Sequence, residues 1–166
     1  MSAIEISTPY TRSPNSAGGV DVFHEIYNAT EKEMKYITFT YLPYNSVGDL
    51  VACSIKKTSE AICKLTGPFA PGKSTYVDWK NVWYNSTIQK VKLKEVKIQY
   101  MDDTEEIIDG ESLIDIRNDP ESKLGKIRAI ERAEREKKEK KQKLIIGGII
   151  AAVAILFFVA VLKASL

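Results

Sequence analysis

Few residues of this 166-residue chain have the types and spacing that chemistry requires. His24 is the only histidine, and a metal site needs several His, Cys or carboxylate ligands at matched spacing. We therefore expect His24 to be structural, at an inward-facing position of a strand. The sequence contains no Gly-rich phosphate loop, and its candidate nucleophiles have no visible base. It predicts neither an enzyme nor a bound cofactor.

A run of six carboxylates is the strongest candidate for metal chemistry. Its members are Asp102, Asp103, Glu105, Glu106, Asp109 and Glu111. Calcium prefers several oxygen ligands arranged by a tight, Gly-bearing loop, and this run does not have that spacing. The favoured interpretation is the solvated end of a hairpin. The alternative is a divalent-metal-dependent sensor or enzyme that uses residues Asp102 to Glu111.

Aromatic residues and cysteines each allow a structural and a functional interpretation. Trp79, Trp83 and Tyr84 lie close together in the sequence, and such clusters form binding hot spots for protein partners. A β-sandwich core also needs large side chains, so core packing is the favoured interpretation. Cys53 and Cys63 form neither a disulfide framework nor a metal-spaced pair, and we expect both to be small buried residues.

Short β-strands must position these residues. Val20, Val22, His24 and Ile26 alternate along one strand, and residues 36–44 are dense in β-branched and aromatic types. Strands are expected near residues 20–26, 36–44, 50–54, 60–65, 75–79, 82–84, 96–100 and 105–108. About seven short strands with turn signals at roughly ten-residue intervals predict a mainly β fold, an antiparallel β-sandwich.

Three runs of residues carry a family resemblance. They read NAT…KYITFTYLPYNSVGD, then TGPFAPG, then WKNVWYNSTIQKVKL…VKIQYMDD. Together they resemble an uncharacterised family of bacterial Ig-like domains, found mainly in Gram-positive bacteria and their phages. The first run is also similar to FxLYD-type modules. The resemblance covers about residues 16–108 and implies an Ig-like β-sandwich, without enzymatic activity or catalytic residues. Relatives often have Gly in the last hairpin turn, where this chain has Asp103.

An apolar segment follows near the C-terminus. Residues 144–162 are nineteen residues without a charge, a hydrogen-bonding side chain or a proline. A helix of this length spans roughly 28 Å, close to the hydrocarbon core of a bilayer. The segment is predicted to be a transmembrane helix, with membrane-spanning residues Leu144, Gly147, Gly148, Ala151, Ala152, Phe157, Phe158 and Leu162. The small residues four apart, Gly147/Ala151 and Gly148/Ala152, favour close helix approach and a homodimer.

Charge flanking this segment predicts its orientation. Five basic residues precede it: Lys137, Lys138, Lys140, Lys141 and Lys143. The positive-inside rule places the N-terminal domain in the cytoplasm, as expected for a single-pass, tail-anchored protein of the cell membrane. The same lysines should attract anionic phospholipid. The alternative is an extracytoplasmic, envelope-associated domain of inverted topology, which predicts a Cys53–Cys63 disulfide.

The N-terminal domain, here called the head, differs in charge from the segment that precedes the apolar residues. Residues 123–143 carry ten Lys/Arg and four Glu, whereas residues 1–122 have a net charge of −5. An acidic head excludes nucleic acid as a favoured partner. Asp119 and Pro120 predict a helix start. The expected segments are 1–18 flexible, 19–110 sandwich, 111–119 linker, 120–143 helical stalk that adds to the dimer contact, 144–162 membrane span and 163–166 tail. We expect a membrane-tethered module that binds an unknown protein partner.

Overall fold

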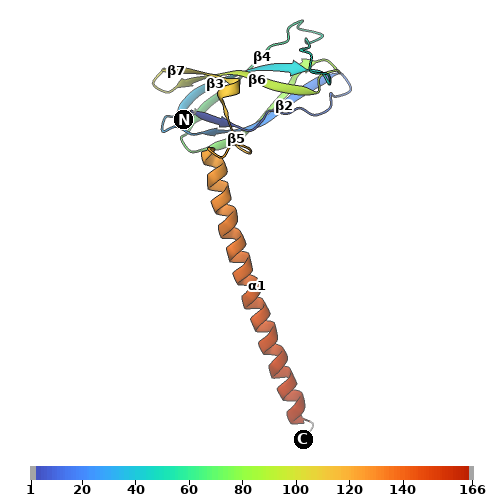
Figure 1. Ribbon diagram of the computed structural model, residues 1–166, viewed down its shortest axis with the longest axis vertical. Helices are drawn as coiled ribbons and strands as arrows, with labels where there is room; N and C mark the ends of the chain where they lie inside the picture. Colours follow the sequence, from blue (N-terminus) through green and yellow to red (C-terminus); the bar gives the residue numbers. More distant parts are fainter. Residues whose placement is uncertain (1–2, 165–166) are drawn as a thin grey trace. The chain divides into compact units, whose positions relative to one another are not determined.

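The structure is a computed structural model that describes residues 3–164, apart from the side chains of Ile114 and of residues 149–164. It divides into two compact units, Met1–Gly125 and Lys126–Leu166. The first unit is a two-sheet β-sandwich, and the second is helical (Figure 1). We describe each unit by itself.

The described residues form eight strands, one short 3-10 helix and one long helix. Their bounds are β1 (Ile4–Ile6), β2 (Gly19–Asn28), β3 (Met34–Tyr44), β4 (Ala61–Phe69), β5 (Ser74–Tyr84), β6 (Lys90–Tyr100), β7 (Glu105–Asp109), η1 (Gly110–Ser112), β8 (Ile114–Asp115) and α1 (Lys123–Ala164).

Seven antiparallel strands make the sandwich, three in one sheet and four in the other. The first sheet has the order β5-β2-β1, and the two-residue strand β8 extends it by pairing parallel with β1. The second sheet has the order β4-β3-β6-β7. The predicted antiparallel β-sandwich followed by a C-terminal helix is therefore confirmed.

The core lies between the sheets, where alternating residues of β2, β3 and β6 meet. In β2, the side chains of Val20, Val22, His24 and Ile26 are fully buried, as the period-two pattern predicts. The inward-facing residues Ile37, Phe39 and Tyr41 of β3 lie opposite them and are at most 1% exposed. Apolar burial on this scale is the main favourable term in folding.

Two predictions about strands are wrong: one predicted strand does not form, and two others are parts of a single strand. Residues 50–54 form a loop rather than a strand, in which only Leu50 makes a β-bridge, with Tyr44. The chain turns back instead, because Lys57, with a φ of 58°, donates its N–H to the Cys53 carbonyl. Residues 75–79 and 82–84 belong to the single strand β5, in which Asn81 has a φ of 51° opposite a register shift in β2.

The segments expected to be a flexible lead-in and a linker both contribute to the sandwich. Residues Ala3 to Ser7 are buried, and β1 pairs with β2 from Ile4 to Ile6. The expected linker 111–119 contains part of η1, all of β8 and the buried Ile116. Three residues are too few for a recognisable alternation, which explains why the pattern missed β1.

The helical unit consists of α1, which runs without a break to Ala164. Where the structure describes side chains, no helix is both long and apolar enough to cross a membrane. The predicted span 144–162 lies mostly outside those residues, because side-chain description ends at Gly148. The membrane-anchor interpretation therefore stays a prediction.

Candidate functional site

A buried carboxylate joins the sandwich to the first turn of α1. Glu5 of β1 is 1% exposed, and its carboxylate accepts hydrogen bonds from the backbone N–H groups of Lys123, at 2.7 Å, and Leu124, at 3.1 Å. The Ser122 hydroxyl donates to the same carboxylate at 2.8 Å. The first N–H groups of a helix have no partner within the helix, and the helix dipole is positive there. The Glu5 carboxylate accepts from these N–H groups and also places a negative charge at the positive end of the helix dipole.

The remaining contacts at this junction close the first turn of α1. Ser122 Oγ accepts from the N–H of Gly125 at 2.9 Å, so Ser122 is the N-cap residue. Lys123 Nζ donates to the Ala29 carbonyl at 2.7 Å. A small buried cluster comprises Leu124, Tyr27, Ala29 and Ile116. The predicted N-cap, Asp119, instead accepts from the N–H of Glu121 in the turn before the helix.

Further along α1, the basic residues predicted to lie beside a membrane are exposed. They are Lys137, Lys138, Lys140, Lys141 and Lys143. Gly147 and Gly148 have no neighbouring atom within 4 Å of the position of an added Cβ. The side chains of Ala151, Ala152, Phe157, Phe158 and Leu162 lie outside the described residues, as does that part of the predicted dimer contact.

Trp79, Trp83 and Tyr84, for which core packing is the favoured interpretation and a partner surface the alternative, contribute to the core. Trp83 is 1% exposed, and its indole N–H donates to the Ser59 carbonyl at 2.8 Å. Trp79 and Tyr84 are half-buried and pack against the same core. Of the two interpretations of this cluster, the geometry favours core packing for Trp83, which offers no surface to a partner in this structure.

His24 belongs to a polar network between the sheets. Its Nε2 hydrogen-bonds to the hydroxyl of Tyr41, which also accepts from Trp79 Nε1 at 3.2 Å. Burial lowers the pKa of His24 to about 4 and raises the pKa of Tyr41 well above its usual range. Both groups are therefore neutral near pH 7, as the structural interpretation of His24 expects.

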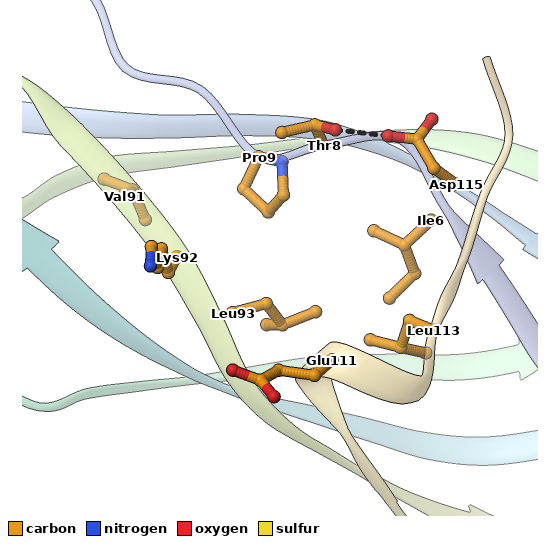
Figure 2. A pocket seen from close by; sticks show the side chains of 10 residues that line it. Ile6, Thr8, Pro9, Val91, Lys92, Leu93, Glu111, Leu113 and Asp115 are labelled. Atoms are coloured by element: carbon orange, nitrogen blue, oxygen red, sulfur yellow. Dashed lines mark hydrogen bonds between the residues drawn. The ribbon is translucent and has the colours of Figure 1, made fainter. Parts of the chain in front are cut away.

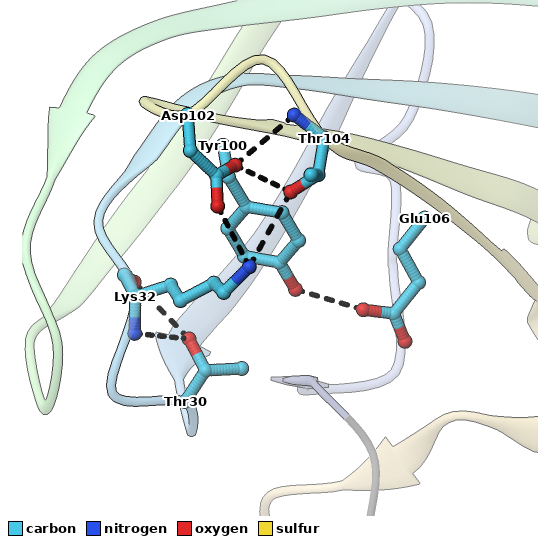
Figure 3. A network of polar contacts seen from close by, with 6 residues as sticks. All are labelled: Thr30, Lys32, Tyr100, Asp102, Thr104 and Glu106. Carbon is cyan, nitrogen blue, oxygen red and sulfur yellow. Dashed lines mark hydrogen bonds and ion pairs between the residues drawn. The ribbon is translucent and has the colours of Figure 1, made fainter.

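The predicted acidic cluster is divided among separate partners. Figure 3 shows Asp102 accepting from Lys32 Nζ at 2.8 Å and from Thr104, while the Tyr100 hydroxyl donates to Glu106 at 2.8 Å. The Lys32 and Thr104 contacts hold the pKa of Asp102 well below its usual range. Asp102 is therefore bound within a hairpin network rather than directed at a common ligand.

Three of the four other carboxylates of this run also have local partners. Asp103 pairs with Lys35 at 2.6 Å and Glu105 pairs with Lys97 at 2.8 Å. Asp109 accepts from the N–H of Glu111 and caps η1. Within the described residues, no three His, Cys, Asp or Glu side chains converge as metal ligands would. The geometry thus gives no support to the metal-dependent alternative.

Both cysteines are free thiols. Cys53 is buried, and its Sγ accepts from the backbone N–H groups of Lys56 and Tyr84 at 3.4 Å each. Cys63 is half-buried on β4, where burial raises its pKa to about 11. The core position of Cys53 agrees with the expectation of a small buried residue.

A cleft opens on one side of the sandwich, between β1 and β6. It has a volume of about 310 Å³ and a floor of Ile6, Pro9, Val91, Leu93 and Leu113 (Figure 2). Its polar lining residues are Thr8, Lys92, Glu111 and Asp115. Burial alone would raise the pKa of Asp115, but hydrogen bonds from Thr8 and from two backbone N–H groups outweigh it and hold the pKa below its ordinary value. Asp115 therefore carries a negative charge at neutral pH.

No family model, curated protein or solved structure matches the chain. The function must therefore be argued from the chain's own residues.

Sequence reasoning missed the two features that the structure makes most distinctive. Glu5 and Ser122 lie 117 residues apart, so no local pattern links them; the one available signal was a charged residue between two isoleucines. The cleft combines residues from the N-terminus, from β6 and from the segment after β7. Its prediction would have required the sheet order as well as the strands.

Proposed function

We propose that this chain is a single-pass membrane protein that presents an Ig-like β-sandwich on the cytoplasmic side as a protein-binding module, without catalysis. One observation carries the proposal. Helix α1 starts on the sandwich, where buried Glu5 fixes its first turn, and continues without a break through the apolar segment 144–162. A folded head therefore leads directly into a helix with the length and composition of a membrane span.

The sequence of the helical unit supports the membrane part of the proposal. Nineteen residues from Leu144 to Leu162 contain no charged residue, and a lone segment in lipid must be helical to satisfy its backbone. Five exposed lysines precede this segment within seven residues. They favour a cytoplasmic head and would bind anionic headgroups at about 1 kcal/mol for each basic residue near the surface.

Sheet topology supports the Ig-like part of the proposal. The strand orders β5-β2-β1 and β4-β3-β6-β7 are those of a seven-strand sandwich. Here the fourth strand pairs with the third, whereas in constant-type Ig domains it joins the other sheet. Domains of this architecture commonly recognise proteins, and their binding surfaces lie on loops and sheet edges.

Small residues of α1 support an additional dimer contact within the membrane. Gly147 and Gly148 have open space around their Cα atoms, which allows the backbone of a second helix to approach closely. Ile127 and Ile130 are exposed on the stalk, at 43% and 62%, and would extend such a contact outside the bilayer.

Protease protection combined with membrane extraction tests this proposal. The full chain, carrying an N-terminal epitope, is compared with a variant that lacks residues 144–166. We expect the full chain to remain in the membrane fraction at alkaline pH, its epitope protected in intact cells and cleaved after lysis. The truncated chain should be soluble. A full chain that alkali extracts would contradict the anchor, and an epitope cleaved on intact cells would contradict the cytoplasmic head.

A further inference from the structure

Strand β6 is longer than the strand that covers it. β6 runs from Lys90 to Tyr100 and pairs with β3 along most of that length. On its other side, β7 pairs only with residues Glu95 to Gln99. The described pairs therefore leave the start of β6 without a strand neighbour on the β7 side.

The chain leaves this position because of a turn after β7. Asp109 accepts from the N–H of Glu111 and caps η1, which diverts the backbone away from the line of β7. Gly110 crosses directly over Leu93, since an added Cβ would lie 2.0 Å from the Leu93 carbonyl oxygen. Beyond that crossing, residues Lys90–Lys92 border the cleft with an open strand edge.

The backbone groups of Val91, in the middle of this edge, are not used by β3. Val91 lies opposite Pro43, which has no N–H, and the Pro43 carbonyl accepts from Val51 at 3.1 Å instead. Strand edges with free N–H and C=O groups bind extended peptides by adding a strand. Three residues of edge correspond to about 10 Å, enough for a short added strand.

The cleft beside this edge fits a side chain of the added strand. Its volume of about 310 Å³ and its apolar floor of Ile6, Leu93 and Leu113 are typical of a small ligand pocket. The longer edge strands of the two sheets are blunted: β4 contains Pro68, β5 presents exposed Asp78 and Lys80, and β7 presents exposed Glu105 and Glu106. Such features discourage strand addition.

Charge at the rim selects the kind of peptide. Glu111 is exposed on η1 at one end of the cleft, and Asp115 lies at the other end, where its carboxylate accepts from Thr8 (Figure 2). The one cation of the lining, Lys92, holds its Nζ over the ring of Tyr44, 5.3 Å from the centroid. Two negative charges therefore border the cleft against this one cation, and basic side chains of a partner complement them.

We propose that this cleft binds an extended, cationic peptide segment of a protein partner, which adds to β6 at Lys90–Lys92 and inserts an apolar side chain between the sheets. This inference deepens the proposed function and rests on its protein-binding part. The backbone edge supplies affinity, the cleft selects an apolar residue, and Glu111 and Asp115 select basic neighbours.

A peptide titration followed by NMR tests the proposal on the full chain in lipid nanodiscs. The probe is the capped peptide Thr-Lys-Leu-Lys-Val-Thr. Two matched probes carry N-methyl groups on alternate amides, one probe for each register, and a third has Glu in place of Lys. We expect the parent peptide to shift the amide signals of Val91 and Leu113, and we expect the Glu peptide and one of the two N-methylated peptides to bind at least about tenfold more weakly.

Two charge-reversal variants of the protein complete the test. Glu111→Lys should weaken binding of the parent peptide about fivefold, while Glu31→Lys, an equal charge change on the β2–β3 loop, should alter it less than about twofold. Binding of both N-methylated peptides as tight as that of the parent, equal effects of the two variants, or no binding at millimolar peptide would overturn the proposal. So would Val91 and Leu113 signals that move with protein concentration alone, because a second copy would then occupy the cleft. Each of these results leaves membrane extraction and epitope protection unaffected, so the cleft can fail while the proposed function stands.

Discussion

Protonation of His24 should make the sandwich less stable in mild acid. The His24 ring is fully buried between the sheets and hydrogen-bonds to Tyr41. Burial lowers its pKa from 6.5 to about 4, and a hydrogen bond that the protonated ring donates to the backbone of Glu25 offsets only part of that effect. The unfolded chain therefore binds a proton between pH 6.5 and 4 that the folded chain does not bind.

The sign and the size of the effect follow from this difference in pKa. Stability is complete above pH 6.5 and falls as the pH approaches 4, because the proton is gained only on unfolding. With these two values of the His24 pKa, the free energy of unfolding decreases by about 2 kcal/mol between pH 8 and pH 5. Below pH 4 the loss levels off at about 3 kcal/mol.

Replacement of His24 by phenylalanine isolates this contribution. The variant keeps an aromatic ring beside Phe39 and leaves the Tyr41 hydroxyl bonded to Trp79. Urea unfolding can be followed by tryptophan fluorescence, because both tryptophans of the chain lie in the sandwich. Carboxylates that titrate in the same range are common to both proteins and cancel in the comparison.

We expect the stability of the wild-type chain relative to His24→Phe to fall by about 2 kcal/mol from pH 8 to pH 5. The absolute stability of the variant does not matter, since only the change with pH is compared. A difference constant within about 0.5 kcal/mol would refute the reasoning. It would mean that the folded chain accepts the proton, and hence that the ring reaches water or a hidden acceptor.

Three further predictions concern the junction, a turn and a thiol. Glu5→Ala should lower the free energy of unfolding by about 3 kcal/mol, because buried N–H groups of α1 lose their acceptor, whereas Glu31→Ala on an exposed loop should change it by less than about 0.5 kcal/mol in the same urea assay. Gly110→Ala should cost about 2 kcal/mol, since the new methyl carbon would lie 2.0 Å from a carbonyl oxygen; an unchanged urea midpoint would contradict this crossing. In a Cys53→Ser background, Cys63 should react with maleimide at pH 7.5 about 100-fold more slowly when folded than in urea, because its pKa is raised from 9.0 to about 11. Equal rates would show that the thiol is not buried.

The strands that the sequence predicted are those with a long alternating pattern. β2 and β3 have ten and eleven residues, and their inward-facing side chains repeat every second residue, so periodicity identifies them. β1 has three residues, all buried, and buried strands show no alternation. The loop at residues 50–54 has an apolar composition like a strand, but Val51 bonds back to Pro43 and the chain turns at Cys53.

The sequence predicted which candidate site residues face the core, but it did not predict which residues they contact. The sequence suggested that His24 is inward-facing and that the aromatic residues belong to a core, because both follow from strand periodicity. It could not show that Asp102 would bond to Lys32, 70 residues away. The start of α1 is a sharper example. Asp119 and Pro120 are a strong local signal, yet the helix begins at Lys123, because a carboxylate from β1 reaches its N–H groups.

The cost of burying Glu5 explains where α1 begins on the sandwich. A buried carboxylate is unfavourable unless its oxygens are fully hydrogen-bonded. Glu5 has three donors, all from residues 122–124, so its burial is tolerated only when α1 starts at that place on the sandwich. A helix that began one residue earlier or later would leave the charge without its donors. An apolar residue could bury the same surface without this requirement, so the carboxylate contributes specificity more than stability.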